Sequence, residues 1–384
     1  MLRHLLAPLD LWTFRSEYLE RRHLHIARDD AAYLAPLFGI ADLEDALVLA
    51  GRDPGLVALV KDGEPELAAE SYTMQRVHPR ARMTGRAPAT VLDTRAIVRY
   101  YADGWTVVLR DAALFSAKLQ RACNALIAEL GAYVQPNVYL TPPEGTGFAP
   151  HYDTHDTLIV QIEGTKRWRL YQPLVTLPTE LQPCPPDLER AQLAPLDAIT
   201  LHPGDTLYLP RGVIHEAQSR SGRSLHVTFA LAPVRGIDAL DHAARISSSA
   251  DLALRGAIGA DESVALPDAA ALPLGIEAAY DWMFRAVRAD AAGSFDQIER
   301  LRAANGNSVL RMAEGAAYML RPRSDGLALL VAGKTIPLLP LFAPSMERLG
   351  HGPVAIAELD PALSPEHRML LVRILVLEGV AVLE

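Results

Sequence analysis

The sequence predicts a mainly β core with accompanying helices, followed by a helical region and a small mixed unit. Three observations lead to this prediction. Between Gln135 and Pro233, short runs of β-branched and aromatic residues alternate with Gly and Pro turns. From Gly236 to about Leu301, Ala, Leu and Arg recur with helical spacing. The remaining residues mix both patterns, and a chain of 384 residues is long enough for two or three domains.

The N-terminal part, from Ser16 to about Leu130, shows no single period. Helical spacing is present in Ile40–Ala50 and Ala113–Leu130, where apolar residues recur every three or four positions. We expect this part to be a scaffold for the β region, so that residues 1–235 form one domain.

The β region contains six runs with the composition of strands. Turn signals such as Pro203-Gly204-Asp205 separate them, and many short strands with such turns are typical of an antiparallel barrel or sandwich. Prolines interrupt any period between Leu174 and Asp197, so we expect a long excursion from the barrel there. The runs are Asn137–Thr141, Thr157–Ile162, Arg167–Tyr171, Ala198–Leu201, Thr206–Leu209 and Leu225–Leu231.

Residues 236–303 are predicted to form a small helical domain. Its Ala-rich, moderately apolar faces are suited to packing against a second copy of the chain. Residues 304–384 are predicted to form a third domain, with strands at Ser308–Tyr318 and Leu327–Ile336 and a short helix near Phe342–Leu349.

A longer helix starting at Pro365 has the strongest local signals in the chain. Ser364 is suited to the N-cap, Pro365 to the first helical position and Gly379 to the end of the helix. A last strand, Val380–Leu383, completes a pattern that resembles a winged-helix unit. From Asn305 to Glu384, seven Lys or Arg against eight Asp or Glu leave a net charge of -1, which disfavours DNA binding.

Charge and cysteine content exclude several classes of protein. With 37 Lys and Arg against 46 Asp and Glu, the net charge of -9 argues against a protein that coats nucleic acid and favours basic partners. Cys123 and Cys184 are too few for a disulfide framework or a four-thiolate zinc site, which indicates a reducing compartment.

Neither a signal peptide nor a membrane span is expected. Met1–Phe14 lacks the apolar run and the cleavage site of a secretory signal, and Leu327–Phe342 is interrupted by Lys334 and two prolines. We therefore expect a soluble cytoplasmic protein.

The candidate chemistry lies in His151-Tyr152-Asp153 together with His215. On an extended strand, residues i and i+2 project from one face, so His151 and Asp153 can bind one ion while Tyr152 points away. A second strand can then supply His215. Two imidazoles and one carboxylate with open positions are typical of non-haem Fe(II) oxygenases.

The triplet alone is weak evidence. Random placement of 12 His and 46 acidic residues predicts roughly 1.4 triplets of this kind, and the chain has one. The context favours a site, because His151 follows a Gly- and Pro-rich stretch before an apolar strand and His215 follows a strand end and tight turn. His155 and Asp156 are better suited to the loop or the substrate mouth, since Asp153 already completes the ligand face.

Lys166 is a second candidate. The chain holds only four Lys, and the remaining 33 of its 37 basic residues are Arg, so a Lys at the start of Arg167–Tyr171 is unusual. Inside a barrel, a compact ammonium group can hold a carboxylate end-on. An ordinary solvated turn lysine after Gly164-Thr165 is the alternative.

Six short motifs follow one another around these side chains. They are Asn137-Val-Tyr139-Leu-Thr141-Pro142, Pro150-His-Tyr-Asp153, Gln161-Ile-Glu-Gly164, Lys166-Arg-Trp-Arg-Leu-Tyr171, Pro203-Gly-Asp205 and Leu209-Pro-Arg-Gly-Val-Ile-His215. Together they resemble the JmjC oxygenases of the cupin superfamily, specifically the branch of ribosomal-protein hydroxylases. The resemblance implies a double-stranded β-helix, followed by a helical dimerisation domain and a winged-helix-like domain.

The resemblance also implies roles for individual residues. His151, Asp153 and His215 would bind Fe(II), and Lys166 would bind the far carboxylate of the co-substrate 2-oxoglutarate, with O2 as the oxidant. The same resemblance places four further residues at the co-substrate pocket: Asn137, Tyr139, His226 and Thr228. Tyr139 and Thr228 could equally be ordinary inward-facing barrel residues.

The implied activity is hydroxylation of a side chain, His or Arg, in a ribosomal or other basic protein by a homodimer. Within this resemblance, Lys at position 166 slightly favours a His target, because bacterial arginine-hydroxylating members can carry Arg there. Hydroxylation of a biosynthetic precursor peptide and N-methyl-lysine demethylation remain open within the same chemistry. A cupin enzyme that uses the metal without a keto acid, and a non-catalytic cupin and winged-helix scaffold, also remain open.

Overall fold

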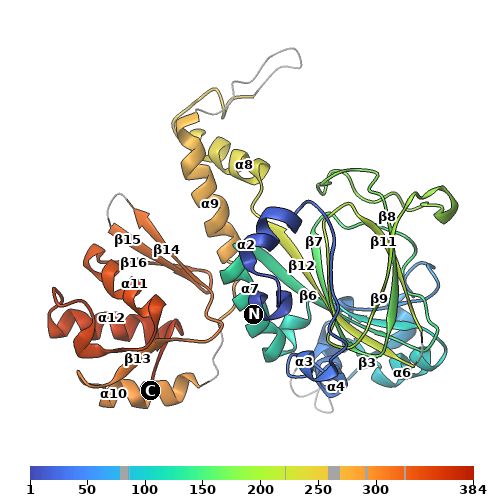
Figure 1. Cartoon of the computed structure of the whole chain (residues 1–384), viewed down its shortest axis with the longest axis horizontal. Helices are drawn as coiled ribbons and strands as arrows, with labels where there is room; N and C mark the ends of the chain where they lie inside the picture. The colour runs from blue at the N-terminus through green and yellow to red at the C-terminus, as the bar shows by residue number, and fades with distance from the viewer. Residues whose placement is uncertain (78–84, 86, 221, 258–268, 290–292, 324–325) are drawn as a thin grey trace. The chain divides into compact units, whose positions relative to one another are not determined.

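The computed structural model describes residues 1–77, 85, 87–220, 222–257, 269–289, 293–323 and 326–384. The chain divides into two compact units (Figure 1). The first contains Met1–Cys123 and Val134–Ala232, and the second contains Asn124–Tyr133 and Pro233–Glu384. Each unit is described by itself.

The first unit is built on two facing sheets (Figure 1). The larger has seven strands in the order β1-β10-β7-β12-β6-β5-β2, and the smaller has three in the order β11-β8-β9. The strands of the large sheet are β1 (Leu24–Ile26), β2 (Val57–Val60), β5 (Thr106–Leu109), β6 (Ala132–Thr141), β7 (Asp156–Glu163), β10 (Thr206–Leu209) and β12 (Ser224–Pro233). Those of the small sheet are β8 (Lys166–Tyr171), β9 (Pro195–Leu201) and β11 (Ile214–Ser219).

From β6 onward the chain passes back and forth between the two sheets. β6 and β7 lie in the large sheet, β8 and β9 in the small one, and β10, β11 and β12 then alternate. This is the double-stranded β-helix that the sequence analysis expected. Gly164 makes the turn from β7 to β8 with φ +67, and a Cβ there would lie 1.9 Å from the carbonyl oxygen of Arg223, so only glycine fits.

The core of the barrel lies between the two sheets. Side chains from both sheets form one buried cluster, which consists of Ile159, Trp168, Leu170, Ile199, Leu201, Leu207, Leu209 and Val213. Full burial of a large aliphatic or aromatic side chain stabilises the fold by about 1.5–3 kcal/mol. Along β8, successive side chains point alternately into the space between the two sheets and away from it.

All six predicted strands of the β region are confirmed, but six further strands described in the first unit were not among the predicted runs, including β1, β2, β5 and β11. A second strand was expected to supply His215, but no run was predicted for β11, because its sequence Ile214-His-Glu-Ala-Gln-Ser219 is mostly polar. β2 and β5 lie in the region interpreted as scaffold, yet both belong to the large sheet. Their four residues each are buried, so no alternation marks them as strands.

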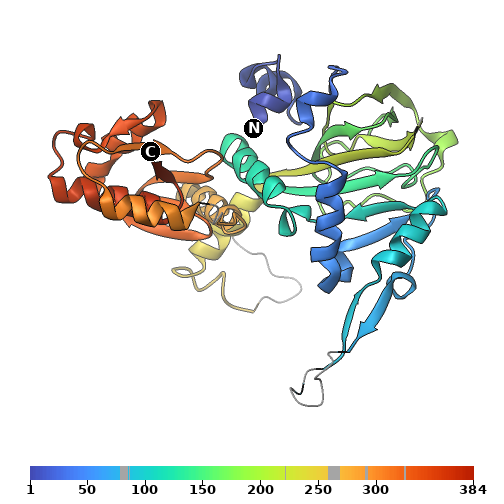
Figure 2. The same cartoon turned by 90° about the horizontal axis from the view of Figure 1, so that it is seen from below.

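The helices of the first unit are short. The predicted helix Ile40–Ala50 is confirmed as α4 (Ile40–Leu49), and Ala113–Leu130 contains α7 (Ala117–Leu130) after a 3-10 turn. The others are α1 (Leu2–Leu6), α2 (Leu11–Thr13), α3 (Ala31–Leu34) and α6 (Thr94–Ala102). The ribbon of β3 (Thr73–Arg76) and β4 (Ala89–Leu92) projects from the sheets (Figure 2).

The predicted excursion is confirmed. Between β8 and β9 the regular structure is a single 3-10 turn, Arg190–Gln192. One residue of that turn, Arg190, donates hydrogen bonds to Glu216 of β11.

Besides Asn124–Tyr133, the second unit contains a packed pair of helices, α8 (Gly236–Ser247) and α9 (Leu272–Phe284). Gly275 of α9 faces Ala239 and Ala243 of α8, and a Cβ on Gly275 would lie 2.3 Å from the Ala239 carbonyl oxygen. Small residues therefore let the two backbones approach closely. α10 (Ser294–Ala303) follows.

The C-terminal part contains two small sheets and two helices. The sheets are β17-β13-β18 and β14-β15-β16. The elements are β13 (Val309–Met312), β14 (Tyr318–Arg323), β15 (Gly326–Val331), β16 (Lys334–Leu338), α11 (Ala343–His351), β17 (Val354–Ala355), α12 (Pro365–Leu377) and β18 (Ala381–Leu383).

The local signals of α12 are confirmed, whereas two strand predictions need correction. The Ser364 hydroxyl accepts a hydrogen bond from the His367 N–H, and Gly379 has φ +69 after the helix. Leu327–Ile336 is not one strand but the hairpin of β15 and β16, which turns at Ala332 (φ +45) and Gly333 (φ +75). Ser308–Tyr318 is a strand only as far as Met312, and the next strand, β14, begins at Tyr318. The winged-helix interpretation and the three domain boundaries stay predictions.

In the described parts of the chain, we find no helix with the length and hydrophobicity that a bilayer span requires.

Candidate metal centre

His151 and His215 are held opposite each other by a pair of backbone hydrogen bonds. The His151 N–H donates to the His215 carbonyl at 3.1 Å, and the His215 N–H donates to the His151 carbonyl at 2.8 Å. This isolated antiparallel bridge joins the loop before β7 to the second residue of β11. The two imidazole centroids lie 4.5 Å apart as a result.

Both imidazoles are oriented by a carbonyl two residues earlier in the chain. Nδ1 of His151 lies 2.8 Å from the Ala149 oxygen, and Nδ1 of His215 lies 3.0 Å from the Val213 oxygen. A carbonyl can only accept, so each Nδ1 carries the proton and donates. In the neutral form of each ring, Nε2 is then the lone-pair donor, and this form of histidine binds metals.

Asp153 completes the cluster. Its Oδ2 lies 3.8 Å from Nε2 of His215 and accepts a hydrogen bond of 3.3 Å from the Thr157 hydroxyl. One ligand atom from each of His151, Asp153 and His215 lies within 4.8 Å of the others. Tyr152 points away, because its hydroxyl donates to the carbonyls of Gln182 and Pro183, as the alternation argument expected.

The electrostatics of the cluster favour a cation. Burial, reinforced by the neighbouring His151, lowers the pKa of His215 to about 4, so this imidazole is neutral at pH 7. Burial by itself would raise the pKa of Asp153, but the rings of His155, His215 and His151 outweigh it and hold that pKa below its ordinary value. Two imidazoles and one carboxylate fit a divalent ion of the Fe(II) type.

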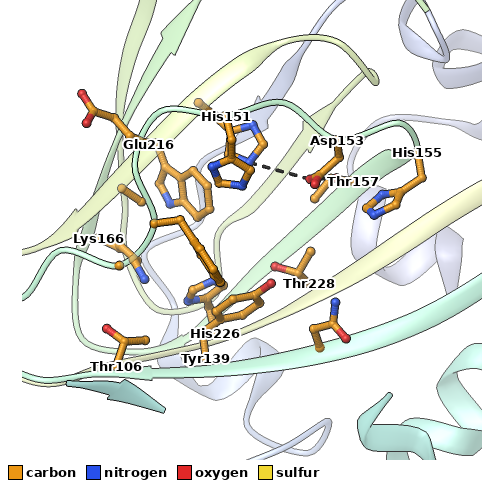
Figure 3. Close-up of a pocket in the computed structure, with 16 residues that line it drawn as sticks. Thr106, Tyr139, His151, Asp153, His155, Thr157, Lys166, Glu216, His226 and Thr228 are labelled. Atoms are coloured by element: carbon orange, nitrogen blue, oxygen red, sulfur yellow. Dashed lines mark hydrogen bonds and ion pairs between the residues drawn. The ribbon is translucent and has the colours of Figure 1, made fainter. Parts of the chain in front are cut away.

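The cluster opens into a cavity with an empty volume of about 650 Å³, part of it open to solvent (Figure 3). The cavity brings together all eight residues that the sequence analysis proposed, including Lys166, Asn137, Tyr139, His226 and Thr228. The residues that sequence reasoning did not single out are Thr106, Gly147, Phe148, Thr157, Trp168, Glu216 and Ala217, and His155 was placed at the mouth.

Lys166 lies at the other end of this cavity from the imidazoles (Figure 3). Its side chain is buried, with 3% of the residue exposed, and Nζ donates 2.9 Å to the Thr141 hydroxyl. Within the described residues that is its one hydrogen bond, and no carboxylate pairs with it. Burial consequently lowers the pKa of Lys166 to about 7. A buried ammonium with unused donors is suited to an anionic ligand.

The remaining pocket residues form one wall. The Tyr139 and His226 rings stack at 4.7 Å, and Nδ1 of His226 is buried with no hydrogen-bond partner in the described part of the chain. Burial, together with the nearby Lys166, lowers the pKa of His226 well below its ordinary value. Asn137 is partly used by the fold, because its Oδ1 accepts from the Asp111 N–H at 3.1 Å.

Asp156, in contrast, belongs to the scaffold. It is fully buried and accepts from the Tyr208 hydroxyl at 2.6 Å and from the Arg211 N–H at 3.0 Å. Trp168 gave a usable signal in principle, since it lies on a predicted strand at a position that alternation directs inward. Thr106 gave none, because all four residues of β5 are buried and that strand was not predicted. Glu216 and Ala217 gave none, because β11 itself was not recognised.

Comparison with known proteins agrees with this geometry. Residues 110–237 match the model of the JmjC domain family. Ribosomal oxygenase 1 of Gallus gallus is 35% identical over 231 residues, which cover 59% of this chain and 36% of that protein. Ribosomal oxygenase 2 of Rattus norvegicus is 33% identical over 233 residues, covering 59% of this chain and 46% of that protein.

A third relative is the bifunctional lysine-specific demethylase and histidyl-hydroxylase NO66 of Drosophila mojavensis. It is 31% identical over 236 residues, which cover 60% of this chain and 24% of that protein. The chain thus spans less than half the length of each of these three relatives.

Among solved structures, the ribosomal oxygenase YcfD of Escherichia coli in complex with cobalt and 2-oxoglutarate has a TM-score of 0.52. The match covers 98% of this chain and 99% of that one at 14% sequence identity. Another structure of YcfD has a TM-score of 0.53 at 16% identity. At this level of identity the likeness shows a shared fold, which confirms the predicted fold class.

Proposed function

We propose that this protein is a 2-oxoglutarate- and Fe(II)-dependent oxygenase that hydroxylates a protein side chain, a proposal supported by the match of residues 110–237 to the JmjC domain family. One observation carries the proposal. A single cavity holds three convergent metal-binding side chains at one end and, at the other, a buried lysine that no described carboxylate pairs with.

Each end of the cavity has a distinct role. His151, Asp153 and His215 would hold Fe(II) through two Nε2 atoms and a carboxylate oxygen. Lys166 would pair with the carboxylate of 2-oxoglutarate that lies farther from the metal, and Thr141 keeps the ammonium in place. Asn137, Tyr139, His226 and Thr228 would line the co-substrate. When bound, Fe(II), 2-oxoglutarate and O2 together supply the oxidising equivalents for hydroxylation of a C–H bond.

The protein excludes water and restricts the substrate's approach. Phe148 and Trp168 place apolar surface beside the imidazoles, with ring centroids 5.6 Å from His151 and 5.8 Å from His215. The substrate enters from the open side of the cavity, so only a side chain that reaches between these rings is oxidised.

We propose a His or Arg side chain of a ribosomal or other basic protein as the target. The net charge of -9 suits a basic partner, and the relatives described above carry the names ribosomal oxygenase and histidyl-hydroxylase. We also propose that the protein acts in the cytoplasm, with a catalytic domain at residues 1–235, a helical domain at 236–303 and a winged-helix-like domain at 304–384.

The helical domain is proposed to mediate a homodimer. Helices α8 and α9 expose several large apolar side chains, among them Trp282 with 64% exposure, which a monomer would leave in water. The others are Ile237, Leu240, Leu272, Leu274 and Ile276.

Ligand binding and turnover test this function directly. We expect Mn(II) and 2-oxoglutarate together to raise the melting temperature more than either alone, since they bind only the folded state. With Fe(II) and O2, incubation with ribosomal proteins should produce succinate and a +16 Da product by mass spectrometry. Stabilisation by Mn(II) that 2-oxoglutarate does not increase would favour a cupin that uses no keto acid. A -14 Da product on a lysine would instead identify a demethylase.

A further inference from the structure

A second concave surface adjoins the metal cavity. It has an empty volume of about 700 Å³ and shares Phe148, Glu216 and Ala217 with the cavity. We call it the flanking groove. Along β8, Lys166 and Trp168 line the cavity, whereas Arg167 and Arg169 line the flanking groove. The two hollows therefore lie on opposite faces of the small sheet, next to its edge at β11.

Glu216 is the acidic centre of the flanking groove. Its carboxylate turns away from the imidazoles in Figure 3 and is 7% exposed. Arg190 binds it with two nitrogens, of which Nε lies 2.8 Å from Oε1, and the Tyr171 hydroxyl donates at 2.6 Å. A nitrogen of Arg169 lies 3.4 Å from Oε1. One buried carboxylate thus lies between two guanidinium groups.

Arg167 adds a third positive charge. No described residue forms a hydrogen bond or an ion pair with its side chain. The other acid of the groove, Asp62, accepts a hydrogen bond from the Thr146 hydroxyl. Three arginines therefore face two carboxylates, which leaves a positive excess on a protein whose net charge is -9.

A guanidinium group without a partner is suited to a carboxylate, which it can bind through two parallel hydrogen bonds. Leu188, Pro150 and Phe148 supply apolar walls, which strengthen such a pair by displacing water. An extended peptide advances about 3.3 Å per residue and turns alternate side chains to opposite sides. A peptide whose target side chain enters the metal cavity can therefore place a nearby side chain in the adjoining groove.

We propose that the flanking groove binds the carboxylate of an Asp or Glu that lies within a few residues of the hydroxylated side chain, with Arg167 as its main contact. This inference rests on the proposed function. It narrows the substrate to a basic protein whose target residue has an acidic neighbour.

Selection from a peptide library tests the proposal. The probe is a mixture of short peptides with a central His or Arg. Each of the remaining positions carries either Glu or Gln. Protein loaded with Mn(II) and 2-oxoglutarate captures peptides, and sequencing compares Glu with Gln at each position. We expect Glu to be enriched about three- to tenfold at one or two positions, as for one partly exposed charge-assisted hydrogen bond.

Two variants identify the contact. Arg167→Gln should remove the enrichment at those positions, and Arg167→Lys should keep part of it. Arg95→Gln, an exposed arginine of α6, should leave the enrichment unchanged. Equal capture of Glu and Gln, an enrichment spread evenly over all positions, or an enrichment that survives in Arg167→Gln would each overturn the proposal.

Failure of the proposed function would look different. It would appear as wild-type protein that 2-oxoglutarate with Mn(II) does not stabilise and that forms no succinate. The capture experiment reports on the groove in either case, because it measures binding and not turnover.

Discussion

The two ends of the cavity satisfy their polar groups in different ways. At the metal end, Nδ1 of both imidazoles and Oδ2 of Asp153 have hydrogen-bond partners from the protein itself. At the lysine end, Lys166 forms one hydrogen bond among the described residues, from Nζ to Thr141, and Nδ1 of His226 is buried with no hydrogen-bond partner among those residues.

This difference indicates how each end is built. The metal end is preorganised by local backbone carbonyls, so its side chains are oriented before any ion binds. The lysine end carries the cost of buried, unsatisfied groups, and an anionic ligand would relieve that cost. Substitutions at the metal end should therefore abolish binding of the metal. Substitutions at the lysine end should selectively lower the affinity for the co-substrate.

The largest effect should come from Asp153→Ala or His151→Ala. Either change removes one of three ligands, and we expect Mn(II) affinity to fall by more than about a hundredfold, with no detectable succinate. Titration calorimetry and a succinate assay measure the two quantities. Asp103→Ala, at an exposed position after α6, is the matched control. Unchanged succinate production in either ligand variant would refute the assignment.

Lys166→Met should lower the affinity for 2-oxoglutarate without lowering the affinity for the metal. The methionine keeps most of the side-chain volume but has no charge, so we expect 2-oxoglutarate affinity to fall about ten- to a hundredfold, the loss of one charge-assisted hydrogen bond. Mn(II) affinity in the absence of 2-oxoglutarate should stay within about twofold of wild type, because no hydrogen bond links Lys166 to the cluster. A parallel loss of Mn(II) affinity would show that the ends are not independent.

The pH dependence of stability should also report on Lys166. Burial lowers its pKa to about 7 from an ordinary value of 10.5, so the unfolded chain binds more protons than the folded one between these values. Stability of the ligand-free wild type should therefore rise from pH 7 to pH 9 relative to Lys166→Met. The affinity for 2-oxoglutarate should fall over the same range, as the ammonium loses its proton. Melting curves of the two proteins at several pH values measure the first effect. A difference in melting temperature that stays constant from pH 7 to pH 9 would contradict it.

The smallest effect is expected from Thr157→Val. This substitution removes the 3.3 Å hydrogen bond to Asp153 at nearly constant volume, so Mn(II) affinity should fall by only about three- to tenfold. Thr157→Ser, which keeps the hydroxyl, should have the Mn(II) affinity of the wild type. An effect as large as that of Asp153→Ala would mean that Thr157 orients the ligand far more strongly than the distance indicates.

Part of the fold was predictable because it depends on local sequence. The six strands of the β region have β-branched and aromatic residues bounded by turns, and α12 has Ser364 at its N-cap. β11 escaped prediction because its stability comes from pairing with β8 over six residues and not from its own composition. The β15–β16 hairpin was read as one strand, since both halves are apolar and only Ala332 and Gly333 mark the turn.

The candidate site shows the same division. The chemical nature of its side chains was evident from the sequence: imidazoles, one carboxylate two residues from an imidazole, and one rare lysine at the start of a strand. So was the direction of Tyr152, because alternation along an extended segment needs no partner.

Only the tertiary structure decided that the His151 and His215 ring centroids lie 4.5 Å apart, that no described carboxylate pairs with Lys166, and that Arg167 lines a separate groove. Each of these facts depends on the backbone bridge between the loop before β7 and β11, and on the register of β11 against β8. Such pairings join residues far apart in the chain. Their register is set by the packing of two sheets around one core, which no local stretch of sequence encodes.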